Sequence, residues 1–111
     1  MVAVDTITTV NKLTDESGEQ ITLVAHVNDE ENNLAVYEGQ LTFTVDTTEI
    51  DTVNIINGVA TKTWTIPTGW TSDDYTITAV YLGTDNYNTS TGTNTLTIPT
   101  DPPNPKTGFD T

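Results

Sequence analysis

Two short stretches of this chain gather side chains that bind hard cations. One begins at Asp29 and continues through Glu30 and Glu31 into two asparagines; the other begins at Asp85 and continues Asn-Tyr-Asn. Ca²⁺ takes about six to eight oxygen ligands from carboxylates, amides and backbone carbonyls. Neither stretch has the ligand spacing of an EF-hand loop. The four carboxylates are therefore candidate calcium ligands, and solvated acidic loops are the alternative.

Nucleophilic and acid–base catalysis both need groups that converge on one point. The only histidine is His26, and the alternation around it places its ring on the outer face of a strand, away from the expected loops. A serine nucleophile needs a neighbouring base, and glycoside hydrolysis needs two acids facing across a cleft. The sequence shows neither pattern, so we predict that the chain is not an enzyme.

Two aromatic residues in expected loops are candidate ligand contacts. Trp70 stands between Gly69 and Thr71, and Tyr87 follows the second acidic stretch. Exposed rings of this kind stack on a saccharide or pack on a protein, and a contiguous patch containing both would indicate a carbohydrate- or protein-binding module. The alternative is that these rings cap the core, which Trp64, Tyr75 and Tyr81 are expected to fill.

Alternation of apolar and polar residues with a period of two predicts strands along the whole chain. The turn dipeptide Asn57-Gly58 predicts a hairpin whose two central residues have positive φ. Residues 12–18 are expected to form a turn, residues 47–51 a polar crossing, and no window has a helical period. The expected strands are 2–10, 20–28, 40–46, 53–57, 59–66, 74–82 and 93–98. About seven antiparallel strands predict an all-β sandwich, with a small barrel as the alternative.

Residues 1–98 are expected to form one domain, a size that buries a sizeable core. Residues 99–111 are rich in proline, which resists sheet pairing, so this segment is interpreted as a linker or tail. The chain has no cysteine, 16 acidic residues and three lysines, for a net charge of −13. Such a surface repels nucleic acid. The apolar runs are too short for membrane insertion.

Four segments resemble the bacterial and archaeal Ig-like repeat domains of invasin-like, cell-surface adhesins. They read QITLVAHV at 20–27, GQLTFTV at 39–45, NGVAT at 57–61 and DYTITAVYLGTDNY at 74–87. The resemblance covers residues 2–98 and implies a non-catalytic extracellular module, associated with the cell surface or cell wall, that serves as a stalk, spacer or adhesion domain. The implied partners are neighbouring domains of the same polypeptide and a host or cell-surface glycan or protein. No cofactor is expected, and the calcium ion is the alternative.

Lys62 departs from this resemblance, because the family usually has Leu or Phe at the matching position. Alternation places Lys62 on the inner face with Ala60 and Trp64, where an unpaired ammonium is costly. The resemblance to surface Ig-like domains of Gram-positive bacteria implies an isopeptide bond to an asparagine, for which Asn94 is the candidate. The alternative is that the ammonium reaches outward to water from the sheet end.

The tail contains a candidate signal for attachment to the cell wall. Its residues are Asn104, Pro105, Lys106, Thr107 and Gly108. This run resembles a variant of the sortase recognition motif, in which cleavage falls between the last two residues, and an ordinary linker is the alternative. The triplet that begins at Asn88 is also a candidate acceptor for N-glycosylation.

Overall fold

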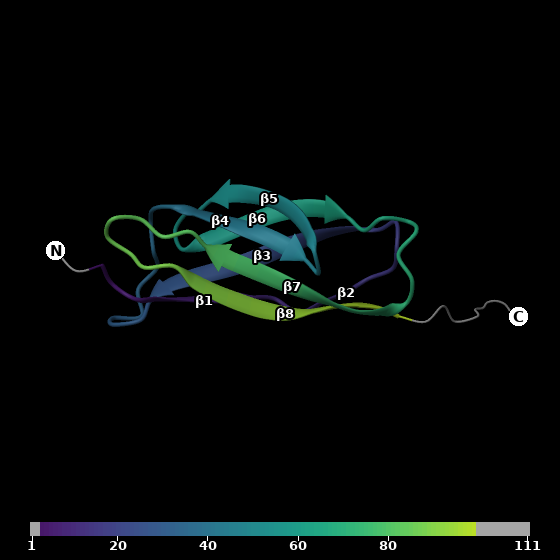
Figure 1. Ribbon diagram of the computed structural model, residues 1–111, viewed down its shortest axis with the longest axis horizontal. Helices are drawn as coiled ribbons and strands as arrows, with labels where there is room; N and C mark the ends of the chain where they lie inside the picture. The colour runs from purple at the N-terminus through teal and green to yellow at the C-terminus, as the bar shows by residue number, and fades with distance from the viewer. Residues whose placement is uncertain (1–2, 100–111) are drawn as a thin grey trace, which may run out of the picture.

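Two sheets packed face to face make up the computed structural model, which describes residues 3–99 (Figure 1). One sheet has the strand order β1-β3-β6 and the other β2-β8-β7-β4-β5. The strands are β1 (Thr6–Val10), β2 (Leu13–Thr14), β3 (Gln20–Asp29), β4 (Gln40–Val45), β5 (Thr48–Asn54), β6 (Val59–Thr65), β7 (Asp73–Tyr81) and β8 (Ser90–Ile98). All pairings are antiparallel except that of β2 with β8. The predicted all-β sandwich is confirmed, with eight strands instead of about seven.

The core lies between the sheets, on the faces that the alternation assigned to it. The inward residues of the central strands are apolar and buried: Ile21, Leu23, Ala25 and Val27 on β3, Leu41, Phe43 and Val45 on β4, and Ile77, Ala79 and Tyr81 on β7. Burying one such aliphatic or aromatic side chain contributes about 1.5–3 kcal/mol. Because the side-chain period is two, this burial also determines the strand register.

Tyr81 ties the core to the loop before β4. Its ring is fully buried, and burial raises the pKa of its phenol. The hydroxyl donates a hydrogen bond of 2.8 Å to the carbonyl of Glu38. Gly39 has a φ of 97°, and a Cβ there would lie 2.8 Å from the Tyr81 ring. The glycine therefore lets the chain pass against the ring and enter β4.

The connections around β5 include one confirmed turn and one wrong expectation. Asn57 and Gly58 have φ values of 54° and 78°, and the main chains of Ile56 and Val59 exchange two hydrogen bonds across them. The predicted turn is thus confirmed, although it connects two different sheets. Residues 47–51, expected to be a polar crossing, belong largely to β5, which pairs with β4 through a tight turn. A polar segment forms a strand here because its main chain completes the ladder.

β2 was not predicted, since residues 12–18 were expected to form a turn. Leu13 and Thr14 pair in parallel with Leu96 and Thr97 of β8. A strand of two residues is too short to show a period, so only the long-range pairing reveals it.

The described chain begins and ends at opposite ends of the sandwich (Figure 1). The N-terminal end holds the start of the chain near Val4 and the loops 30–39, 55–58 and 82–89. The C-terminal end holds Pro99 and the loops 15–19 and 66–72. The candidate residues are therefore divided between two ends that are separated by the length of β7 and β8.

Candidate functional site

The three loops at the N-terminal end meet around residues 34–40. The amide of Ile55 donates to the carbonyl of Gly39 at 3.0 Å, and the amide of Leu82 donates to the carbonyl of Gln40 at 2.9 Å. Ala35 packs against the turn at Gly58 so closely that an added Cβ would lie 2.6 Å from its own Cβ. Loops that are far apart in sequence therefore form one continuous end surface.

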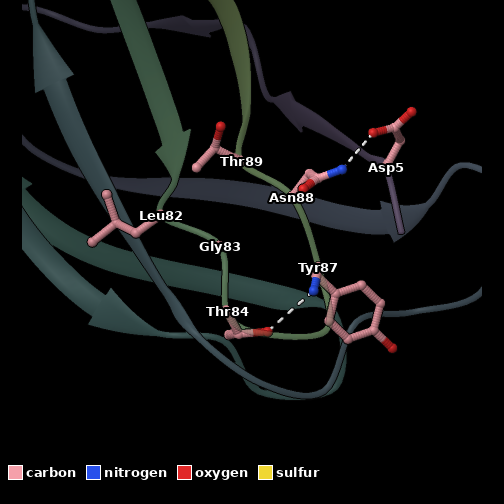
Figure 2. A pocket seen from close by; sticks show the side chains of 7 residues that line it. All are labelled: Asp5, Leu82, Gly83, Thr84, Tyr87, Asn88 and Thr89. Atoms are coloured by element: carbon pink, nitrogen blue, oxygen red, sulfur yellow. Dashed lines mark hydrogen bonds between the residues drawn. The ribbon is translucent and has the colours of Figure 1, made fainter. Parts of the chain in front are cut away.

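A shallow pocket of about 480 Å³ lies on this surface next to Asp5. Figure 2 shows that its lining comes from the loop between β7 and β8 and from the segment that precedes β1. The amide of Asn88 donates to the Asp5 carboxylate at 2.7 Å, and the main-chain amide of Tyr87 donates to the Thr84 hydroxyl at 3.2 Å. The lining includes one carboxylate and no nucleophile paired with a base, so its chemistry is that of polar contact.

Glu38 joins two of these loops, although sequence analysis did not single it out. Its carboxylate accepts hydrogen bonds from the Thr84 hydroxyl and from the Asn86 amide, the latter at 3.2 Å. Together with the Tyr81–Glu38 bond, these contacts hold the loop before β4 against the loop after β7. The sequence feature that could have identified Glu38 is its position directly before Gly39, the glycine that leads into β4.

The candidate calcium ligands do not converge. The Asp29 carboxylate is buried and accepts bonds from the main-chain amides of Glu31 at 2.7 Å and Asn32 at 2.9 Å, so it closes its own turn. The hydrogen bond from Asn32 is the main reason that the pKa of Asp29 lies below its usual value. Asp85 lies in a different loop. Within residues 3–99, no three acidic, histidine or cysteine side chains are arranged to hold a metal ion.

Trp70 and Tyr87 lie at opposite ends of the described chain, so they do not form the contiguous patch that would indicate a carbohydrate- or protein-binding module. The Trp70 ring stacks on Tyr75 with centroids 4.7 Å apart and meets Trp64 edge-on at 5.4 Å. This cluster is half-buried and closes the C-terminal end of the core. Tyr87 follows the other end of β7, which spans nine residues, or about 30 Å.

Lys62 faces the side predicted for it, but β6 is the edge of its sheet. Its ammonium lies 3.0 Å from the carboxylate of Asp51 on β5, the edge strand of the other sheet, and the Lys62 side chain is 37% exposed. The hydrogen bond from Lys62 lowers the pKa of Asp51. This geometry matches the alternative stated from the sequence, in which the Lys62 ammonium reaches outward to water.

Asn94 does not meet Lys62, so the predicted isopeptide pair is wrong. Its amide donates to the carbonyl of Val10 at 2.9 Å. β8, which carries Asn94, is separated from β5 by β7 and β4. Three strand spacings amount to roughly 14 Å. The asparagine belongs to the contact between the first and last strands instead.

That contact, here called the seam, joins the segment 4–14 to the segment 87–97. Val4 bridges Tyr87 in parallel at one end, and Leu13 pairs in parallel with Leu96 at the other. Both pairings have the same sequence separation, so the two segments keep one parallel register along the sandwich. Between these ladders, β1 pairs with β3 of the opposite sheet. The seam therefore links the two sheets along one flank.

Side chains complete the seam where the main chains separate. The hydroxyls of Thr6 and Thr8, both on buried residues, bond the hydroxyl of Ser90 at 2.7 and 2.6 Å. Gly92 allows the close approach, because a Cβ there would lie 2.8 Å from the carbonyl carbon of Thr8. These contacts fill the length between the two parallel ladders.

Three expectations are not tested by this geometry. The candidate sortase motif from Asn104 to Gly108 lies outside the described residues, as does all of the proposed linker except Pro99. Glycosylation of Asn88 stays a prediction; its amide donates to Asp5.

Residues 3–99 form no helix, and therefore none that could cross a membrane.

Comparisons with known proteins agree with this architecture. The family described as bacterial Ig-like domain (group 3) matches residues 7–99. Among solved structures, the fibronectin(III)-like modules of Clostridium thermocellum CbhA superpose with a TM-score of 0.54 at 13% identity, over 86% of this chain and 96% of that one. At this identity the likeness concerns the fold alone. No curated protein matches.

Proposed function

Because this chain belongs to the bacterial Ig-like domains of group 3, we propose that it is a non-catalytic mechanical spacer. We place it in an exported bacterial protein, on the cell surface or associated with the cell wall. The observation that carries this proposal is the seam: the first and last strands run parallel, and the chain enters and leaves at opposite ends.

This geometry suits a unit that transmits tension. A pull on the two ends of the domain acts along the strands, whereas the hydrogen bonds of the seam lie across them. The bonds at Val4, Ser90, Asn94 and Leu13 are then strained together, not one after another. A unit loaded in this way resists extension until the whole seam gives way.

The chemistry of the chain supports the same role. It has no cysteine, so its stability rests on the core and the seam. The pocket at the N-terminal end brings no nucleophile and base together. Repetition of such units along a polypeptide would give length, and the acidic surface would keep neighbouring stalks apart.

Single-molecule force spectroscopy tests the proposal. The domain is placed between marker domains and pulled through its two termini, as wild type and as two variants. Ser90→Ala removes the hydroxyl that both Thr6 and Thr8 contact. Thr52→Val is the matched control, because it removes a 2.8 Å hydroxyl pair with Thr42 on the far flank.

Thr52→Val removes one hydrogen bond and should lower the free energy of unfolding by about 1 kcal/mol, whereas Ser90→Ala removes two and should lower it by about 2 kcal/mol. Only Ser90→Ala should lower the unfolding force, since only Ser90 lies in the seam. Equal losses of force in both variants would refute the proposed loading of the seam.

A further inference from the structure

Large apolar side chains that remain exposed are concentrated at the N-terminal end. Among residues 3–99, five large hydrophobic residues are classed as exposed, and four of them lie at this end: Leu34, Tyr37, Ile56 and Leu82. Tyr37 and Ile56 are more than 70% exposed. The fifth, Ile7, lies on the outer face of β1. We call the four residues the N-end patch.

The members of this patch come from the three loops that meet around residues 34–40. Leu34 and Tyr37 flank the segment that contacts Gly58, and Ile56 is the residue directly before that turn. Leu82 bonds Gln40 through its main-chain amide. Ile56 also borders a groove between β5 and β6 that includes Val53 and Val59. The apolar surface therefore continues from the end onto the flank opposite the seam.

Several carboxylates lie at the same end as the patch. The same end carries Asp5, Glu30, Glu31, Glu38 and Asp85. The two lysines within residues 3–99 lie elsewhere: Lys12 between β1 and β2, and Lys62 on β6. The N-terminal end thus presents apolar side chains together with several carboxylates, a combination typical of a protein-binding surface.

We propose that the N-end patch docks a basic polypeptide segment in which aliphatic or aromatic residues alternate with Lys or Arg. Burial of Tyr37, Ile56 and Leu34 would provide the affinity, and the carboxylates would attract and select the cationic partner. This binding activity is additional to the spacer role and does not depend on it.

Charge disfavours three other occupants of the patch: nucleic acid, anionic lipid and a second copy of this chain. Nucleic acid and anionic lipid carry the same sign as the carboxylates at this end. A second copy would present either its own acidic N-terminal end or its C-terminal end, which carries Asp15, Glu16, Glu19 and Asp73. Like charges placed face to face disfavour such a contact. A basic partner is the one whose charge complements the surface.

The patch is held in place before a partner arrives. The loop that carries Tyr37 is held by the bond from Tyr81 to the Glu38 carbonyl and by the contacts of the Glu38 carboxylate with Thr84 and Asn86. A surface that is already ordered loses little conformational entropy on binding.

The test is a titration of the ¹⁵N-labelled chain, followed by NMR, with a short synthetic peptide that alternates Lys and Leu between Gly-Ser spacers. Two matched peptides replace either every Lys or every Leu with Ser. We expect saturable shifts confined to the loops 30–39, 55–58 and 82–89, weakened by added salt. Both matched peptides should bind at least about tenfold more weakly.

Variants of the chain locate the contact. Tyr37→Ser combined with Ile56→Ser should weaken binding about tenfold or more, whereas Thr22→Ser, at an exposed position on β3 toward the other end of the sandwich, should not change it. Glu30→Gln with Glu31→Gln should weaken binding, and the control Glu16→Gln with Asp73→Asn should not. All these side chains are exposed, so the fold is expected to be retained.

Three results would overturn the proposal. The first is absence of binding by the Lys–Leu peptide. The second is a set of shifts spread over both ends, which would indicate simple attraction to the net charge. The third is self-association by sedimentation that Tyr37→Ser abolishes, which would make a second copy the occupant of the patch.

Discussion

The seam gives the sharpest test of this structure, through the substitution Gly92→Ala. Gly92 lies on β8, opposite Thr8 of β1. An added Cβ would lie 2.8 Å from the carbonyl carbon of Thr8, and the carbonyl oxygen would be closer still. Carbon atoms pack at about 3.5–4.0 Å. β1 would therefore have to move away from β8 by about 1 Å.

The cost follows from the bonds that such a movement breaks. The Ser90 hydroxyl contacts at 2.6 and 2.7 Å and the Asn94 contact at 2.9 Å would all be stretched beyond good hydrogen-bond length. Three bonds at about 1 kcal/mol each amount to roughly 3 kcal/mol. The smaller conformational entropy of Ala in the unfolded chain offsets about 0.4–1 kcal/mol of this loss. We expect a net destabilisation of about 2–3 kcal/mol.

Urea unfolding followed by tryptophan fluorescence measures this difference, since a pure stability change shifts the midpoint and leaves the slope unchanged. The melting temperature should fall by roughly 10–20 °C. Gly69→Ala is the control, because nothing lies within 4 Å of its added Cβ and its φ is not positive. That variant should be neutral or slightly stabilising. A Gly92→Ala protein within about 0.5 kcal/mol of wild type would refute the close packing of the seam.

Three further predictions concern single side chains. Tyr81→Phe should cost about 1–3 kcal/mol in urea unfolding, because the carbonyl of Glu38 loses its donor; an unchanged midpoint would contradict this. Lys62→Met should change stability by less than about 1 kcal/mol, since the ion pair is exposed, and should raise the pKa of Asp51 in an NMR titration. The pKa of Asp29 is lowered by folding, so its contribution is present above the unfolded value of about 3.9 and lost as pH falls through the folded pKa. Asp29→Ala should therefore flatten the acid side of the stability–pH curve, and an unchanged curve would argue against the turn-closing role.

The alternation of residues was sufficient to place the strands that have one buried face. β3, β4 and β7 were predicted within one or two residues, because each apolar residue on the wrong face would lose its burial. The Asn57-Gly58 turn was equally predictable, since its positive φ values are a local property of those two residues. The all-β fold class followed from the same local patterns.

Residues whose role depends on distant partners were not predictable in this way. Alternation assigned Lys62 to the inner face, but only the position of β6 at a sheet edge exposes its ammonium to Asp51. Trp70 and Tyr87 were both expected in loops, and only the direction of β7 separates them. The polar residues 47–51 became a strand because β4 offered an unpaired main chain.

The sequence by itself therefore determined the sandwich class, the core-facing residues of the main strands, the negative charge and the local turn at Asn57. The tertiary structure alone decided the parallel seam between the two ends of the chain and the gathering of the N-end patch from three loops. The physical reason is one of range. Side-chain period and turn conformation are set within a few residues, whereas strand order and loop proximity arise from main-chain pairing between segments far apart in sequence.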